Sequence, residues 1–187
     1  MTAAISFMHL RRAAQTIHNG GVVAYPTEGV FGLGCDPDQH EAVLRILTLK
    51  QRDVAAGLIL IAADRNQLDG WINPTADEEQ ALSGSKKVIT WVVTADPRCP
   101  DWITGGRSTC AVRITQHPIA AALCREAGMP LVSTSANKHG HTPAISTLAV
   151  RRIFAESVDY ILPGSTGDTS GSSEIRVARS RAVLRAG

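Results

Sequence analysis

Apolar residues recur along this chain at helical spacing in some stretches and form short unbroken runs in others. The first stretch predicts an amphipathic helix that ends at Asn19-Gly20, because Gly accepts the left-handed conformation that stops a helix. Its buried stripe consists of Leu10, Ala13, Ala14 and Ile17.

Capping residues mark further helices. Asp38 suits the N-cap of one helix, and Thr75 begins a capping-box pattern for a short second one. Pro118 suits the first turn of a third helix, which Gly128 closes, and a fourth is predicted at about 147–154. The buried face of the helix after Asp38 is expected to consist of Val43, Ile46 and Leu47.

The unbroken apolar runs predict strands between these helices. Helices and strands alternate, with some hairpin-like neighbours, so the pattern predicts an α/β fold with a twisted mixed sheet and one domain, 1–187. The segments 97–106 and 164–173 are rich in Gly, Pro, Ser or Thr and are expected to be loops. The expected strands are 22–25, 58–62, 88–94, 109–114, 131–134, 161–162, 175–178 and 182–184.

One strand-to-turn junction combines a polar pair with several glycines. Pro26 should end the strand at 22–25 because it has no N–H to donate, and Thr27 and Glu28 follow directly. Gly29, Gly32 and Gly34 would let the backbone approach a ligand closely. An ordinary tight connection explains the same pattern equally well.

Composition narrows the functional class. The 187 residues are 44% hydrophobic and carry 19 basic and 17 acidic side chains. This near balance of charge does not indicate a nucleic-acid-binding protein. The four cysteines, Cys35, Cys99, Cys110 and Cys124, show no metal-ligand spacing and are expected to be buried free thiols. No apolar run approaches membrane-spanning length, which favours a cytoplasmic protein.

Two polar clusters are candidates for chemistry. Lys50 and Arg52 lie two residues apart, where they form either a solvated helix end or, in irregular chain, a pair converging on an anion. The hydroxyls and amide of 133–137 follow a buried strand, where they form either a self-bonded turn or a ligand site. His139 and His141 lack further ligands, so no metal site is expected, and a P-loop motif is absent.

Five blocks of sequence in order resemble the YrdC-like family of threonylcarbamoyl-AMP synthases. The resemblance implies a sheet that curves around an open, positively lined cavity. It also implies synthesis of threonylcarbamoyl-AMP and pyrophosphate from L-threonine, bicarbonate and ATP, with Mg²⁺ carried by the nucleotide. The product would serve tRNA modification through downstream threonylcarbamoyl-transfer proteins. The blocks are 20–36, Lys50-Gln51-Arg52 with 57–61, 111–113, 130–137 and 173–176.

The same resemblance implies residue roles. Lys50 and Arg52 would be catalytic and would hold the ATP phosphates. The other expected ATP contacts are Thr90, Ser135, Asn137 and Arg185. The expected threonine contacts are Thr27, Arg113, Ser133 and Ser173.

The chain departs from the family pattern in several places. Ser83-Gly84-Ser85-Lys86-Lys87 replaces a Trp-Pro-Gly-Pro turn, and it should be less ordered because Ser and Gly are more mobile than Pro. Asp53 stands where Pro is usual, and Lys138-His139-Gly140 replaces Leu-Ser-Gly. Two alternatives therefore stay open: a paralogue that binds tRNA or double-stranded RNA, and a carbamoyl-adenylate enzyme that uses another acceptor.

Overall fold

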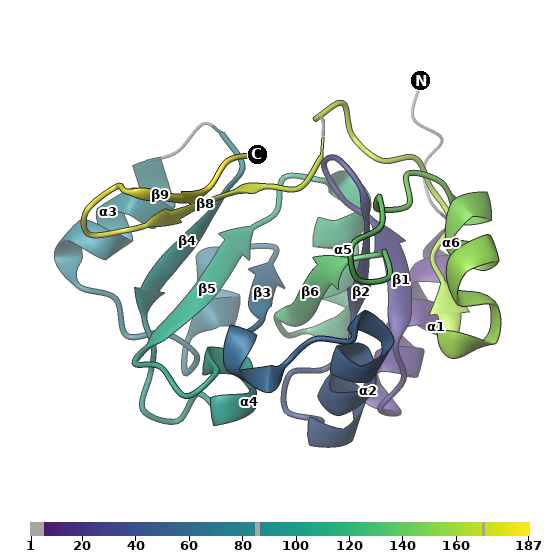
Figure 1. The fold of residues 1–187 in the computed structure, drawn as a ribbon, viewed down its shortest axis with the longest axis horizontal. Coiled ribbons are helices and arrows are strands. Elements are labelled where there is room, and N and C mark those ends of the chain that lie inside the picture. Colours follow the sequence, from purple (N-terminus) through teal and green to yellow (C-terminus); the bar gives the residue numbers. More distant parts are fainter. Residues whose placement is uncertain (1–5, 85–86, 170) are drawn as a thin grey trace.

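The computed structural model describes residues 6–84, 87–169 and 171–187, and in these ranges the strands form one twisted nine-stranded sheet (Figure 1). The strand order is β7-β1-β2-β6-β3-β5-β4-β8-β9. The strands are β1 (Val23–Pro26), β2 (Phe31–Gly34), β3 (Ile59–Ala62), β4 (Ile89–Thr94), β5 (Thr109–Ile114), β6 (Leu131–Ser135), β7 (Tyr160–Ile161), β8 (Glu174–Val177) and β9 (Val183–Arg185).

The sheet is mixed, as the sequence predicts. Three neighbouring pairs, β1–β7, β3–β5 and β4–β8, are parallel, and the other pairs are antiparallel. Strand β6 lies between β2 and β3 and hydrogen-bonds to both, so it joins the two halves of the sheet. At its carboxyl end Ser135 pairs with Gly32 of β2.

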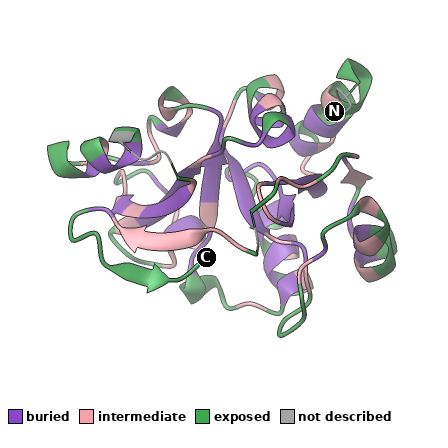
Figure 2. Ribbon diagram, turned by 90° about the horizontal axis from the view of Figure 1, so that it is seen from above, coloured by how far each residue is buried: buried purple, intermediate pink, exposed green. Residues whose placement is uncertain are grey.

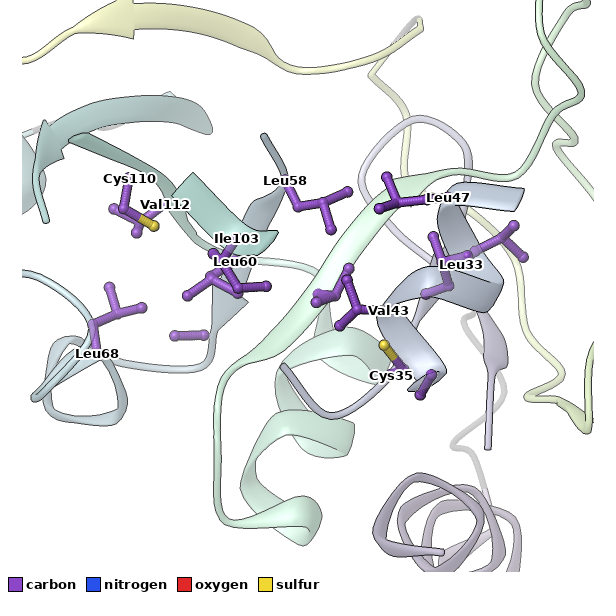
Figure 3. Packing of buried hydrophobic residues seen from close by; sticks show 14 of the residues in the cluster. Leu33, Cys35, Val43, Leu47, Leu58, Leu60, Leu68, Ile103, Cys110 and Val112 are labelled. Atoms are coloured by element: carbon purple, nitrogen blue, oxygen red, sulfur yellow. The ribbon is translucent and has the colours of Figure 1, made fainter. Parts of the chain in front are cut away.

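Helices cover both faces of the sheet. The apolar cluster on one face joins α1 and α5 to Tyr25 and Ile61, while the cluster on the other face joins α2, α3, α4 and α6 to Leu33 and Leu60. Figure 3 shows part of the second cluster, with Leu33 and Leu60 among its labelled residues. Figure 2 shows buried residues concentrated in the central strands and exposed residues along the C-terminal strand. The helices are α1 (Phe7–His18), α2 (His40–Lys50), α3 (Ala76–Gly84), α4 (Asp101–Thr104), α5 (Pro118–Ala127) and α6 (Thr147–Phe154).

Local signals in the sequence account for several element ends. Helix α1 ends where Gly20 adopts a positive φ of 77°, and α5 begins at Pro118 and ends before Gly128 in the left-handed region. At the start of α3 the carboxylate of Glu78 accepts a hydrogen bond of 2.9 Å from the backbone N–H of Thr75, which is one of the two bonds of the predicted capping box.

Three predictions about elements are wrong. The glycine-rich stretch after Glu28 is not all turn, because Phe31–Gly34 forms β2 and pairs with β1. Asp38 does not cap α2: the N-cap is Gln39, and Asp38 instead donates its backbone N–H to the Asp36 carboxylate in a turn. The segment 97–106 is not entirely loop, because α4 lies within it after Pro100. Residues 85–86 of the divergent turn lie outside the described residues.

None of the helices in the described ranges is long and apolar enough to cross a membrane. All four cysteines are buried and free, which confirms the expectation of unpaired thiols.

Candidate functional site

A cavity of about 520 Å³ opens where the β1–β2 turn, the end of α2, the end of β6 and the C-terminal hairpin meet. Four cationic side chains line it, together with hydroxyl groups from several elements. This mixture suits a ligand that carries more than one anionic group. The expected site residues on its wall are Thr27, Lys50, Arg52, Arg113, Ser133, Ser135, Asn137, Ser173 and Arg185.

Lys50 ends helix α2 and is buried, so the interpretation as a solvated helix end is wrong. Its ammonium donates to the carbonyl of Ser135 at 2.7 Å, to the carbonyl of Asn137 at 2.6 Å, and to the side-chain oxygen of Asn137. Burial, and secondly the nearby Arg52, lowers the pKa of Lys50 to about 8. Lys50 therefore fixes the backbone after β6 and places a positive charge at the cavity wall.

The polar turn after β6 is held together by its own side chains. The Ser135 hydroxyl donates to Asn137 Oδ1 at 2.7 Å, and Asn137 Nδ2 donates to the carbonyls of Lys138 and His141. The self-bonded turn and the ligand site, posed as alternatives by the sequence, are thus compatible. The same bonds that close the turn orient Ser135 and Asn137 at the cavity.

Arg113 lies near the end of β5 and is buried. In the described part of the chain, its Nε has no hydrogen-bond partner. The nearest counter-charge is Glu28 Oε2, 3.6 Å from Arg113 Nη2, which is an ion pair but too long for a good hydrogen bond. A buried cation with unused donors at a cavity wall is a strong indication of an anionic ligand.

Arg52 and Arg185 add two more cations to the same cavity. Arg52 makes a long contact of 3.4 Å to the Ala56 carbonyl, and Arg185 donates to the Ser173 carbonyl at 2.8 Å. Burial lowers the pKa of Arg185, and the neighbouring Arg113 and Arg52 lower it further. The guanidinium groups therefore repel one another, and an anion between them would relieve this repulsion.

Hydroxyl groups lie beside these cations. Thr27 is buried and donates to the Val30 carbonyl at 2.7 Å, so its hydroxyl oxygen can still accept a hydrogen bond. Ser133 is buried on β6 between the β2 and β3 strands and lines the cavity. These two hydroxyls can recognise polar atoms of a small ligand.

Thr90 is placed differently from the other expected residues. It is buried within β4 and is not among the described residues that line the cavity. Its hydroxyl lies 2.7 Å from that of Ser173, which does line the cavity. Thr90 therefore reaches the cavity through Ser173.

The segment 164–173 covers one side of the cavity by packing on the β1–β2 turn. The backbone N–H groups of Gly167 and Thr169 donate to the carbonyls of Thr27 and Glu28 at 3.0 and 3.1 Å. A Cβ at Gly29 would lie 2.6 Å from the Thr169 carbonyl oxygen, so this contact requires glycine. The glycine signal in the sequence thus marks a backbone-to-backbone contact beside the site.

Two further groups line the cavity to which the sequence assigned no ligand contact. Glu28 lines the cavity beside Arg113, and His139 lies on its wall. The position of Glu28 in a polar pair after a buried strand was the available signal, but its partner is 85 residues away. Within the described ranges no group of three or more His, Cys, Asp or Glu side chains could hold a metal ion.

Comparison with known proteins gives consistent similarities. Residues 15–187 match the Sua5/YciO/YrdC family model, described as telomere recombination. The chain is 52% identical over 178 residues to the threonylcarbamoyl-AMP synthase of Nitrosococcus oceani, covering 94% of this chain and 96% of that protein. It is 48% identical over 178 residues to that of Halorhodospira halophila, covering 94% and 93%.

A solved structure supports the same relationship. The crystal structure of P. abyssi Sua5 complexed with L-threonine superposes with a TM-score of 0.82 and 32% sequence identity. The match covers 89% of this chain and 49% of that chain, so this chain spans about half of the Sua5 protein.

Proposed function

The chain belongs to the Sua5/YciO/YrdC family, and from this premise we propose that it synthesises threonylcarbamoyl-AMP. L-threonine, bicarbonate and ATP give threonylcarbamoyl-AMP, pyrophosphate and water. The observation that supports this best is a single cavity lined by four cations and several hydroxyls, which can take an amino acid and a polyphosphate side by side. The 187 residues would act as one domain in the cytoplasm.

The amino acid would bind at the Arg113 side of the cavity. The unused donors of Arg113 suit the α-carboxylate, since a guanidinium can bind a carboxylate through two parallel hydrogen bonds. Ser133, Thr27 and Ser173 would contact the remaining polar atoms, with Thr90 supporting Ser173 through its hydroxyl. The threonine amine, once it reacts with bicarbonate, becomes a carbamate that points towards the nucleotide.

The nucleotide would bind at the Lys50 side. Arg52 and Arg185 each make one internal hydrogen bond and keep other donors for the phosphates. The Lys50 ammonium, whose donors hold Ser135 and Asn137, would attract the phosphates by its charge. Ser135 and Asn137 would orient the nucleotide from the turn after β6. The carbamate oxygen attacks the α-phosphorus and pyrophosphate leaves, so the protein contributes positioning and stabilises the developing negative charge.

Mg²⁺ would arrive with the nucleotide. The phosphates supply hard oxygen ligands, and in the described residues no acidic cluster competes for the ion. When bound, the ion would neutralise phosphate charge.

A second candidate, RNA binding, is favoured by the C-terminal hairpin. The exposed side chains of Arg179 and Arg181 lie between β8 and β9. Such a basic edge can contact phosphates of tRNA or double-stranded RNA, to which downstream proteins would transfer the threonylcarbamoyl group. RNA affinity should then fall steeply with salt and fall further in Arg179→Ala.

The test uses purified protein and pyrophosphate release. Release should require ATP, L-threonine and bicarbonate together, and omission of any one should abolish it. Carbamoyl phosphate in place of threonine and bicarbonate tests the alternative acceptor chemistry. Pyrophosphate release that depends on carbamoyl phosphate instead would overturn the proposal, as would salt-dependent RNA binding without any consumption of ATP.

A further inference from the structure

Glu28 is a carboxylate at the cavity whose two oxygens have different surroundings. Oε1 accepts hydrogen bonds from the Thr115 hydroxyl at 2.6 Å and from the backbone N–H groups of Gln116 and His117 at 3.0 and 3.3 Å. Oε2 is buried and has no hydrogen-bond partner in the described part of the chain. Hydrogen bonds to Oε1 therefore fix the position of the side chain, whereas Oε2 is available for an electrostatic interaction.

The charged group nearest to Oε2 is the guanidinium of Arg113. Arg113 Nη2 lies 3.6 Å away, and only 11% of the Glu28 side chain and 9% of the Arg113 side chain are exposed. Coulomb attraction between such weakly hydrated charges is stronger than at the surface. The distance leaves the guanidinium attracted to Glu28 without consuming its donors in good hydrogen bonds.

The charge state of Glu28 is consistent with this arrangement. Burial on its own would raise the pKa of Glu28, but Arg113 and the hydrogen bonds from Thr115 and Gln116 outweigh burial and lower the pKa below its ordinary value. Glu28 is therefore a stable carboxylate and a poor proton acceptor at neutral pH.

Glu28 also connects the elements that surround the amino-acid side of the cavity. Its side chain links the β1–β2 turn to the segment before α5 and to β5, and its carbonyl accepts from Thr169 of the covering loop. A substitution at Glu28 would therefore alter the position of the Arg113 side chain most, because Arg113 is its charged partner.

We propose that Glu28 is a positioning residue, which holds the Arg113 guanidinium against the cavity wall so that its free donors face the substrate α-carboxylate. The inference rests on the proposed function, since it assigns the amino-acid side of that same cavity. It predicts that Glu28 acts on carboxylate recognition specifically, and not on nucleotide binding or on the fold in general.

The experiment compares L-threonine with L-threoninamide, which lacks the carboxylate, by titration calorimetry on the full chain. Wild-type protein should prefer threonine by about tenfold or more, because a site built for a carboxylate rejects an analogue without one. In Glu28→Gln, which keeps an oxygen for Thr115, this preference should fall to about twofold or less while ATP affinity stays within about twofold. Glu79→Gln is the matched control, because it removes a comparable carboxylate from Arg65 in an ion pair that does not line the cavity.

The outcomes separate the two proposals. If wild-type protein binds neither ligand, the proposed function fails and this inference fails with it. Suppose wild-type protein prefers threonine to threoninamide. If Glu28→Gln keeps the same preference, or loses affinity for threonine and ATP equally, the inference alone is wrong. Should Glu28→Gln not fold, Thr115→Val loosens the carboxylate without removing its charge, and it should reduce the preference in the same direction; an unchanged preference would contradict the inference.

Discussion

The side chains around the cavity differ in how much of their bonding capacity the protein already uses. Lys50 and Asn137 have their polar atoms occupied by internal partners, whereas Arg113 and Arg52 keep donors free. Mutations in the first group should disturb the shape of the site. Mutation of Arg52 should remove a ligand contact and leave the fold intact, whereas loss of Arg113 would also leave the buried Glu28 carboxylate without its counter-charge.

Arg52→Ala provides a direct test of a ligand contact. Charge-assisted hydrogen bonds contribute about 1.5–3 kcal/mol, so adenylate formation should fall by about tenfold or more while the melting temperature changes little. Arg125→Ala is the control, because Arg125 is exposed on α5 and lies outside the cavity lining. Near-full activity in Arg52→Ala would remove Arg52 from the phosphate site.

The lowered pKa of Lys50 predicts a pH dependence. Below about pH 8 the Lys50 ammonium is charged, and above that value it loses its proton. The kcat/KM for ATP, which reports the free enzyme, should therefore decline by about tenfold per pH unit well above that pKa. In Lys50→Arg any remaining activity should lack this decline, since guanidinium keeps its proton. A flat wild-type profile to about pH 9.5 would contradict the role of the charged form.

Ser133→Ala tests the amino-acid side of the cavity. Ser133 is buried, and loss of a buried hydroxyl that pairs with substrate costs about 1–3 kcal/mol. The KM for threonine should rise by about fivefold or more, and the Kd for ATP should stay near that of the wild type. Equal losses for the two ligands would indicate a general disturbance of the site.

At the residue scale, the sequence predicts which residues line the cavity better than it predicts their internal hydrogen bonds. Through the resemblance, its expected site residues converge on one wall, except Thr90. It could not predict that the Lys50 ammonium donates hydrogen bonds to Ser135 and Asn137, because those residues are 85 and 87 positions away. Hydrogen bonds of this kind depend on the fold and leave no local pattern.

At the scale of elements, the site depends on a contact between two segments without regular structure. The loop 164–173 rests on the β1–β2 turn through backbone hydrogen bonds and through the missing side chain of Gly29. The sequence predicted the turn and the loop separately. Their contact was not predictable, because small polar residues give no periodic signal that specifies a partner.

Gly29→Ala should displace this loop. The added Cβ would meet the carbonyls of Thr169 and Gly171, so the loop must move, and binding of threonine should weaken by about tenfold. Gly128→Ala is the matched control: its φ of 71° makes Ala unfavourable by roughly 1 kcal/mol, but no atom lies within 4 Å of the new Cβ. The control should lower stability and keep threonine affinity. The reverse result would mean that the loop has no part in binding.

At the scale of the whole molecule, the cavity exists because β6 joins the two halves of the sheet. The apolar runs predicted most strands to within one or two residues, since buried strands have a clear composition. They did not predict the strand order, because pairing between segments far apart in the chain is decided by tertiary packing. The amino-acid side and the nucleotide side therefore meet only in the folded chain.

The central claim is that this one cavity joins threonine, bicarbonate and the adenylyl group of ATP. The most direct measurement is mass spectrometry of the adenylate formed by purified protein with ¹³C-labelled bicarbonate, L-threonine and ATP. The account predicts threonylcarbamoyl-AMP that carries the label and forms in step with pyrophosphate. Pyrophosphate release without a labelled adenylate, or no consumption of ATP at all, would contradict it.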